Sequence, residues 1–155
     1  MRLPEARSTQ AFQKYMDWAY TSDVDLDPTL DLCRKDRLLI DLYLLGDVLD
    51  DVKLRNKTLQ LLNTALCSDE GFLSTANCNR IWEHTPPDSS LRKWIVDAYV
   101  TLCDHEIMAT CGTSFSAEFV LQVAIKALEE IKSGGANEAG LHERVKTYME
   151  PEDDA

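Results

Sequence analysis

The sequence predicts an all-α fold: an irregular domain of about six to seven helices, with at most one short extended segment. Leucine dominates the apolar residues, with 21 Leu against 8 Val and 6 Ile. Because β-branched residues favour strands and leucine favours helices, this excess favours a helical fold. Apolar residues also recur at i, i+3, i+4 and i+7 through much of the chain, which is the spacing of one helix face. A chain of 155 residues makes about one domain and can bury a core without a metal or disulfide.

The first helix is expected over residues 9–20. Its predicted apolar face consists of Phe12, Tyr15, Met16 and Ala19. Val24 and Leu26 then alternate with aspartates, a period of two that is typical of extended chain, and Pro28 ends this segment.

The central helix of the core is expected over residues 38–49. Only Asp41 and Asp47 are charged in this stretch, and a helix that is apolar nearly all round is normally surrounded by protein. Asp50 or Asp51 is then expected to cap a further helix. The core face of that helix, which ends near Leu66, is predicted to be Val52, Arg55 through its aliphatic stem, Leu59, Leu62 and Leu66.

Three more helices and a weakly helical tail are expected in the second half. Each helix follows a serine that can accept a hydrogen bond from a first-turn N–H, and Pro86-Pro87 and Gly134-Gly135 are stop signals. The expected elements are a helix from Ser74 to about His84, one over 91–105 after Ser89 or Ser90, one from Ser114 or Ser116 to Ile131, and a weak pattern over 141–149. The third of these is predicted to direct Phe119, Val120, Val123, Ala124, Ala127 and Leu128 toward the core.

These elements divide the chain into three parts. Residues 1–8 are expected to form a flexible N-terminus, and residues 9–131 a helical domain. Residues 132–155 are expected to form an acidic C-terminal tail that could contain a short helix, with a frayed end.

The charge of the chain excludes two classes of partner. The 27 acidic residues outnumber the 16 Lys and Arg, so the formal net charge is −11. Such a surface repels phosphates, so we expect no nucleic-acid binding and no binding to an anionic membrane. No apolar run approaches the roughly 20 residues of a membrane span.

The cysteines and the N-terminal residues indicate an intracellular protein of the cytoplasm or nucleus. The five cysteines are an odd number, widely scattered and without a Cys-x-x-Cys pair, which favours free thiols in a reducing compartment. Residues 1–10 lack the apolar segment of a secretory signal.

The sequence contains no recognisable catalytic constellation and no cofactor motif, so a non-enzymatic protein without a cofactor is expected. There is no glycine-rich phosphate loop and no Gly-x-Ser-x-Gly. An alternative reading is a metal-binding protein that uses Cys103, His105 and Cys111, although Cys-x-His-x5-Cys is not a recognised zinc spacing. The competing interpretation places His105 at a helix C-terminus, where the helix dipole favours a cation.

Two stretches of the sequence carry a family resemblance. They read Phe12-x-x-Tyr15-x-x-Trp18-x-Tyr20-Thr21, continued by Leu42-Tyr43-x-Leu45-Gly46-Asp47-x-Leu49 and Leu54-Arg55-Asn56, and Trp82-Glu83-His84-Thr85-Pro86-Pro87-x-Ser89-Ser90-Leu91-Arg92-x-x-x-Val96-Asp97. In this order the chain resembles the fungal BTB/POZ-domain proteins. Residues 9–67 are similar to the second half of the domain and residues 72–131 to its helical extension, while the N-terminal sheet region of the family is missing.

The resemblance implies a non-catalytic protein–protein interaction module, resembling a truncated BTB-domain protein, whose partner is another protein or a second copy. It also implies recruitment of a cullin-type ubiquitin ligase, although no cullin-contact motif can be matched residue by residue. A helical adaptor or scaffold of another family is the competing reading. The missing sheet and helices would have packed on the first helix and one side of the central helix. The predicted partner-binding residues are therefore Phe12, Tyr15, Trp18, Leu39 and Tyr43; alternatively these side chains are ordinary core.

Overall fold

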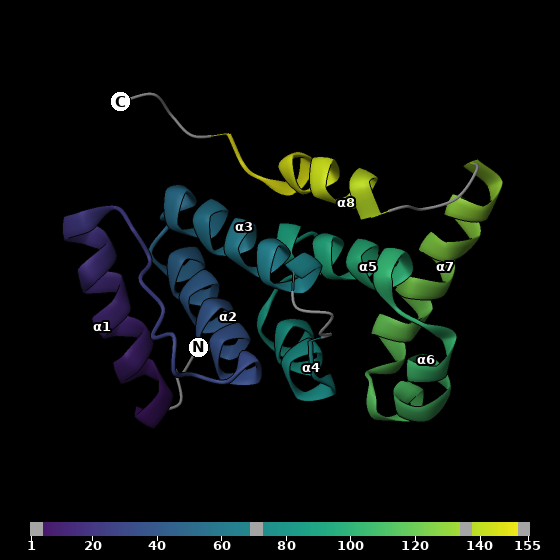
Figure 1. Cartoon of the computed structure of the whole chain (residues 1–155), viewed down its shortest axis with the longest axis horizontal. Coiled ribbons are helices and arrows are strands. Elements are labelled where there is room, and N and C mark those ends of the chain that lie inside the picture. Colours follow the sequence, from purple (N-terminus) through teal and green to yellow (C-terminus); the bar gives the residue numbers. More distant parts are fainter. Residues whose placement is uncertain (1–4, 69–72, 134–137, 152–155) are drawn as a thin grey trace.

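The computed structural model describes residues 5–68, 73–133 and 138–151. The regular secondary structure in these ranges is helical with no strand, which confirms the all-α class. Figure 1 shows α1 and α7 at opposite ends of the longest axis, with α2 to α5 between them. The elements are α1 (Glu5–Thr21), α2 (Leu32–Val48), α3 (Val52–Ser68), α4 (Thr75–His84), α5 (Ser90–Leu102), α6 (His105–Cys111), the 3-10 helix η1 (Gly112–Ser114), α7 (Ala117–Ser133), α8 (Glu138–Arg144) and the 3-10 helix η2 (Val145–Tyr148).

The predicted central helix is the core of the fold, as α2. It packs on α1, α3 and α4, and Ile40 and Leu42 are fully buried within it. Asp31 caps the helix, since its Oδ1 accepts from Arg34 N at 2.9 Å. A Cβ placed on Gly46 would lie 3.1 Å from Arg55 Cγ, so glycine at this position allows α3 to approach α2 closely.

The caps that the sequence predicted are present, in addition to Asp31. Asp51 Oδ1 accepts from Leu54 N at 2.9 Å and begins α3. Ser74, Ser89 and Ser116 accept in the same way at the starts of α4, α5 and α7, at 3.2–3.3 Å from the backbone nitrogens. Each satisfies a backbone donor that the first helical turn leaves open.

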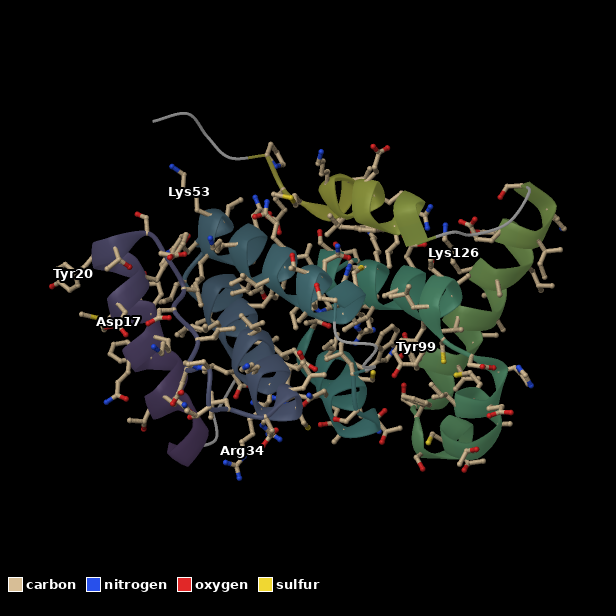
Figure 2. The ribbon with its side chains drawn as sticks, in the orientation of Figure 1. Asp17, Tyr20, Arg34, Lys53, Tyr99 and Lys126 are labelled. Atoms are coloured by element: carbon tan, nitrogen blue, oxygen red, sulfur yellow. The ribbon has the colours of Figure 1, made fainter. Side chains whose placement is uncertain are left out.

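An aromatic cluster joins the second half of the fold. The Phe119 ring of α7 makes edge contacts with Trp82 of α4 at 4.9 Å and Tyr99 of α5 at 5.0 Å, measured between ring centroids. Phe115 lies 5.2 Å from the same ring. Figure 2 shows Tyr99 among the helices, where its hydroxyl donates to Leu73 O at 2.7 Å. This cluster fixes α7 against α4 and α5.

Two sequence-based boundaries need correction. α1 begins at Glu5, so only residues 1–4 of the expected flexible terminus remain outside it, and they lie outside the described residues. The helix expected over 91–105 ends at Leu102, and a separate short helix, α6, begins at His105. The described residues around Val24 and Leu26, where a short extended segment is expected, lie outside any helix and form no strand.

The C-terminal segment packs on the core over residues 141–150 and does not extend as a tail. Leu141 is fully buried and Val145 is 6% exposed. Figure 1 shows α8 lying along α3 and α5, and α8 and η2 contact both helices. The Gly134-Gly135 stop signal and residues 152–155 of the expected frayed end lie outside the described residues.

Candidate functional site

The predicted partner-binding residues do not form one exposed surface. Phe12 is 52% exposed, and Tyr15 and Trp18 are half-buried. Leu39 is only 1% exposed and Tyr43 only 3%, so the prediction is wrong for these two residues. Both lie on α2, which the helices around it cover, and they belong to the ordinary core that was the alternative reading.

The apolar face of α1 is also rotated from the expected one. Ala11 is buried at 3% exposure, and Tyr15 and Trp18 follow it at i+4 and i+7 as the side that packs on the core. Trp18 Nε1 donates to Asp51 Oδ2 at 3.1 Å and so ties the end of α1 to the start of α3. Met16 and Tyr20 are exposed with Phe12, and Figure 2 shows Tyr20 directed away from the fold. A short apolar stripe therefore lies on the outer side of α1.

A second and larger apolar stripe lies on α7, where the sequence reading expected a core face. Phe119 and Val123 are buried as predicted, but Ala124 is exposed and Leu128 is 60% exposed. The prediction was wrong for Ala124 and Leu128 because only one narrow side of α7 packs against the aromatic cluster. The large exposed side chains of α7 are Leu121 at 58%, Ile125 at 43%, Leu128 at 60% and Ile131 at 75%.

A groove of about 330 Å³ lies beside this stripe, between α5 and α7. Ile125, Gln122 and Lys126 line it from α7, and Arg92 lines it from α5. Arg92 Nε donates to Thr85 Oγ1 at 3.0 Å and Nη1 to Glu118 Oε1 at 3.4 Å, and the guanidinium carbon lies 4.8 Å from the centroid of the Trp82 ring. The buried cation of the groove therefore links α4, α5 and α7 to one another.

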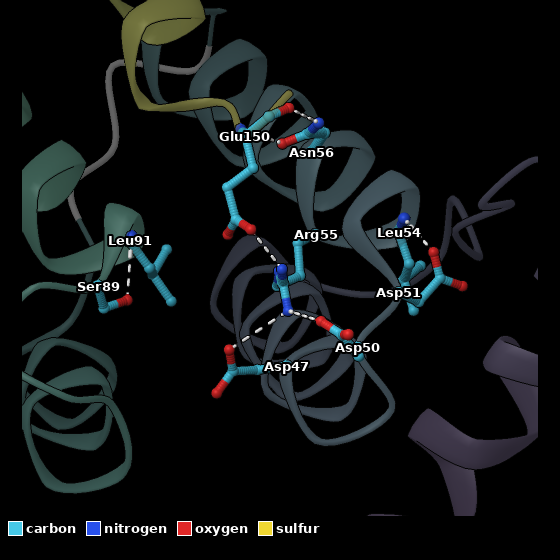
Figure 3. Close-up of polar contacts among 9 residues, drawn as sticks. All are labelled: Asp47, Asp50, Asp51, Leu54, Arg55, Asn56, Ser89, Leu91 and Glu150. Carbon is cyan, nitrogen blue, oxygen red and sulfur yellow. Dashed lines mark hydrogen bonds and ion pairs between the residues drawn. The ribbon is translucent and has the colours of Figure 1, made fainter. Parts of the chain in front are cut away.

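A cluster of charged side chains surrounds Arg55, whose side chain is 7% exposed (Figure 3). Its guanidinium contacts Asp47 at 3.5 Å, Asp50 at 3.7 Å and the Glu150 carboxylate. Burial alone would lower the pKa of Arg55, but the hydrogen bond and charge of Glu150, together with Asp47, raise it above its ordinary value. Arg55 therefore stays charged and fastens the C-terminal segment to α2 and α3.

The backbone of Glu150 is held separately by Asn56, as Figure 3 also shows. Asn56 Nδ2 donates to Glu150 O at 2.9 Å, and Glu150 N donates to Asn56 Oδ1 at 3.0 Å. Asn56 is 3% exposed. This reciprocal pair satisfies the backbone N–H and C=O of Glu150 and holds that residue against α3.

The residues of the alternative metal site do not converge. His105 is the first residue of α6, not the last residue of a helix as expected, and its Nδ1 lies 2.6 Å from Asp104 Oδ1. Its side chain is 90% exposed. Burial, with the nearby Asp104 and Cys111, raises the pKa of the Cys103 thiol, which disfavours the thiolate that a metal requires. Over the described ranges, no three His, Cys, Asp or Glu side chains are grouped to hold a metal ion.

In the described part of the chain, no helix combines the length and apolarity that crossing a bilayer requires. All five cysteines are free thiols.

The motif residues behind the BTB/POZ resemblance serve as contacts between helices. Gly46 and Arg55 meet where α2 crosses α3. Residues of the second motif bind one another, since Arg92 donates hydrogen bonds to Thr85 Oγ1 and to the backbone oxygen of Trp82. Comparison with protein families, with curated proteins and with solved structures gives no match to this chain.

Proposed function

We propose that this chain is a non-catalytic protein–protein interaction module whose binding surface is the outer side of α7. The exposed stripe of Leu121, Ile125, Leu128 and Ile131 carries the proposal. Monomeric proteins seldom expose contiguous apolar patches beyond a few hundred Å², and larger ones mark interaction sites. The stripe follows one side of a single helix, which is how helices present anchors to a protein groove or to another helix.

The roles of the buried charged residues support a non-catalytic function. Arg55 fastens the C-terminal segment, Arg92 joins three helices, and Asp97 binds Arg144 and Tyr148. Each of these groups is used in contacts between elements. A catalytic group needs a face open to substrate and a partner that activates it.

We further propose that the module belongs with the fungal BTB/POZ-like proteins and acts inside the cell, in the cytoplasm or nucleus. The order and spacing of the motif residues in the sequence are the support for the first statement, and the free thiols support the second. The partner is another protein or a second copy. The net charge of −11 argues against nucleic acid and anionic membranes. Recruitment of a cullin-type ligase is proposed on the resemblance alone.

The test is quantitative affinity capture from an extract of the organism that encodes the chain, with identification of captured proteins by mass spectrometry. The wild-type chain is compared with Leu121→Glu/Leu128→Glu on α7. The matched control is Val48→Glu/Leu49→Glu, which places the same two charges on apolar residues that are 52% and 44% exposed at the other end of the fold.

Proteins, including copies of this chain, that are retained by the wild type and the control but lost by the α7 variant would support the proposal. Equal capture by all three chains, or no specific capture by any, would refute it. Each variant is checked for an unchanged circular dichroism spectrum, because the substituted side chains are exposed and their replacement should leave the fold intact.

A further inference from the structure

The exposed side of α7 has the spacing of a helix-pairing seam. Leu121 and Leu128 are seven residues apart, and Ala124 and Ile131 follow them at a distance of three residues, so the four occupy a and d positions of two successive heptads. All four are exposed. Phe119 and Val123, which pack on the core, occupy f and c positions on the opposite side of the helix. The helix therefore has one face that packs on the core and a separate apolar face that is exposed.

We propose that this seam pairs with the α7 of a second copy in antiparallel orientation, forming a homodimer. The inference rests on the proposed interaction function and names its partner. In an antiparallel pair centred near residue 126, Leu121 lies opposite Ile131 and Ala124 lies opposite Leu128 of the second copy. Large residues then face each other at the ends, and a small residue faces a large one in the middle, which lets the helices interdigitate closely. α7 is at one end of the long axis, so a second copy reaches it from outside the fold (Figure 1).

Charge complementarity supports the antiparallel orientation and a second copy as the occupant. Glu118 and Lys132 flank the seam at e positions, near opposite ends of α7. Antiparallel pairing brings Glu118 of each copy beside Lys132 of the other and forms two symmetric ion pairs. A parallel pair would place like charges at the same level. Because each chain carries −11, a contact between copies needs such local complementarity to overcome the overall repulsion.

The length of the seam limits its affinity. Seventeen residues of helix span about 25 Å. One face of a helix of this length buries less than the roughly 800 Å² per partner of a standard interface. We therefore expect weak pairing, with a dissociation constant on the order of 10–100 µM. Added salt screens the two Glu118–Lys132 ion pairs as well as the repulsion between the chains. Because the net charge of −11 on each chain outweighs two ion pairs, we expect the dimer to be stronger at high salt.

Sedimentation equilibrium of the full chain, from about 5 to 500 µM at low and high salt, tests the pairing. Wild type should pass from monomer to dimer over this range, and Leu128→Glu should raise the dissociation constant at least tenfold, because the variant places charges inside the seam. Val48→Glu is the matched control and should dimerise like the wild type. A wild type that stays monomeric at 500 µM in high salt would overturn the proposal, as would a Leu128→Glu variant that dimerises normally.

A charge swap tests the orientation. Glu118→Lys and Lys132→Glu should each weaken the dimer, and the double variant should restore it, because the ion pairs re-form with opposite sign. Glu118 also contacts Arg92 within its own chain, so the melting temperature of each monomer at 5 µM separates a folding effect from a pairing effect. Failure of the double variant to recover would exclude the antiparallel register. If the chain is monomeric yet Leu121→Glu/Leu128→Glu loses other proteins in the capture experiment, self-pairing is wrong and the interaction function stands.

Discussion

Arg144 of α8 donates two hydrogen bonds to the carboxylate of Asp97 of α5, from Nε to Oδ2 at 2.9 Å and from Nη2 to Oδ1 at 3.1 Å. The Asp97 side chain is 1% exposed, and the Tyr148 hydroxyl also donates to its Oδ2, at 2.8 Å. One buried carboxylate thus receives three donors from a segment about 50 residues away in the sequence. The Asp97 carboxylate is therefore one of the contacts that hold the C-terminal segment on the core, beside the Arg55–Glu150 ion pair and the buried Leu141.

Asp97→Asn should lower the free energy of unfolding by about 2–3 kcal/mol, because the amide cannot accept from both Arg144 nitrogens and Tyr148, and hydrogen bonds to buried charges contribute about that much. Urea denaturation followed by circular dichroism measures the change. Asp25→Asn, which removes one carboxylate at an exposed position, is the control and should change stability by less than about 0.5 kcal/mol. Equal stability of the two variants would show that the Asp97 contacts are not formed in solution.

Leu42→Asp should prevent stable folding. Leu42 is fully buried on α2, and a buried unpaired charge costs several kcal/mol against a total stability of about 5–15 kcal/mol. Leu49→Asp, at a 44% exposed position one residue past the same helix, should fold normally. Thermal unfolding checks both variants. A cooperative transition in Leu42→Asp near the wild-type temperature would mean that α2 is peripheral.

Stability should fall as the pH rises above about 9. Burial raises the pKa of the Cys78 thiol from 9.0 to about 12 and raises the pKa of the Tyr99 hydroxyl in the same direction. A raised acid pKa favours the folded state below the unfolded-state value, so this contribution is complete below pH 9 and is lost between pH 9 and 12. Urea midpoints at pH 7 and pH 10.5 measure the loss. Cys78→Ala should show a smaller loss than the wild type, with part remaining because Tyr99 still titrates; equal losses would contradict the assignment to Cys78.

Removal of metal should leave the melting temperature unchanged. A structural zinc contributes about 10 kcal/mol or more, so its loss would be obvious in a thermal scan. His105 is exposed and lies against Asp104, and Cys103 has a raised pKa. Exhaustive chelation followed by calorimetry tests this. A drop of several degrees that is reversed by zinc would revive the site at Cys103, His105 and Cys111.

The elements that could be predicted from sequence are those where a local rule decides. Asp51, Ser74 and Ser116 cap helices because their side chains satisfy nearby backbone donors, and no distant contact is needed. The burial of Leu42 also follows from its helix alone, since apolar residues surround that helix on nearly every side.

The features that the sequence did not predict depend on contacts between segments that are distant in the chain. α7 has apolar residues on two sides, and only its packing against Trp82 and Tyr99 determines that Phe119 is buried while Leu128 is exposed. The heptad spacing of Leu121 and Leu128 is the sequence signal for the exposed side, but the predicted core face included Leu128 and left Leu121 out. The apolar pattern of α2 does predict the burial of Tyr43; its assignment as a partner-binding residue came from the family resemblance and not from that pattern.

Two contacts hold Glu150, and they should differ in strength. The Glu150 carboxylate is 36% exposed where it pairs with Arg55, so solvent screening limits its contribution, and Glu150→Gln should lower stability by only about 0.5–1 kcal/mol. Asn56 is 3% exposed and exchanges two hydrogen bonds with the Glu150 backbone. Asn56→Ala removes both partners of those backbone groups and should cost about 1–3 kcal/mol. Urea denaturation gives the two values, and amide exchange at Glu150 should accelerate in Asn56→Ala far more than in Glu150→Gln. If Glu150→Gln has the larger effect on both measurements, the ion pair with Arg55, and not the Asn56 side chain, anchors the end of the segment.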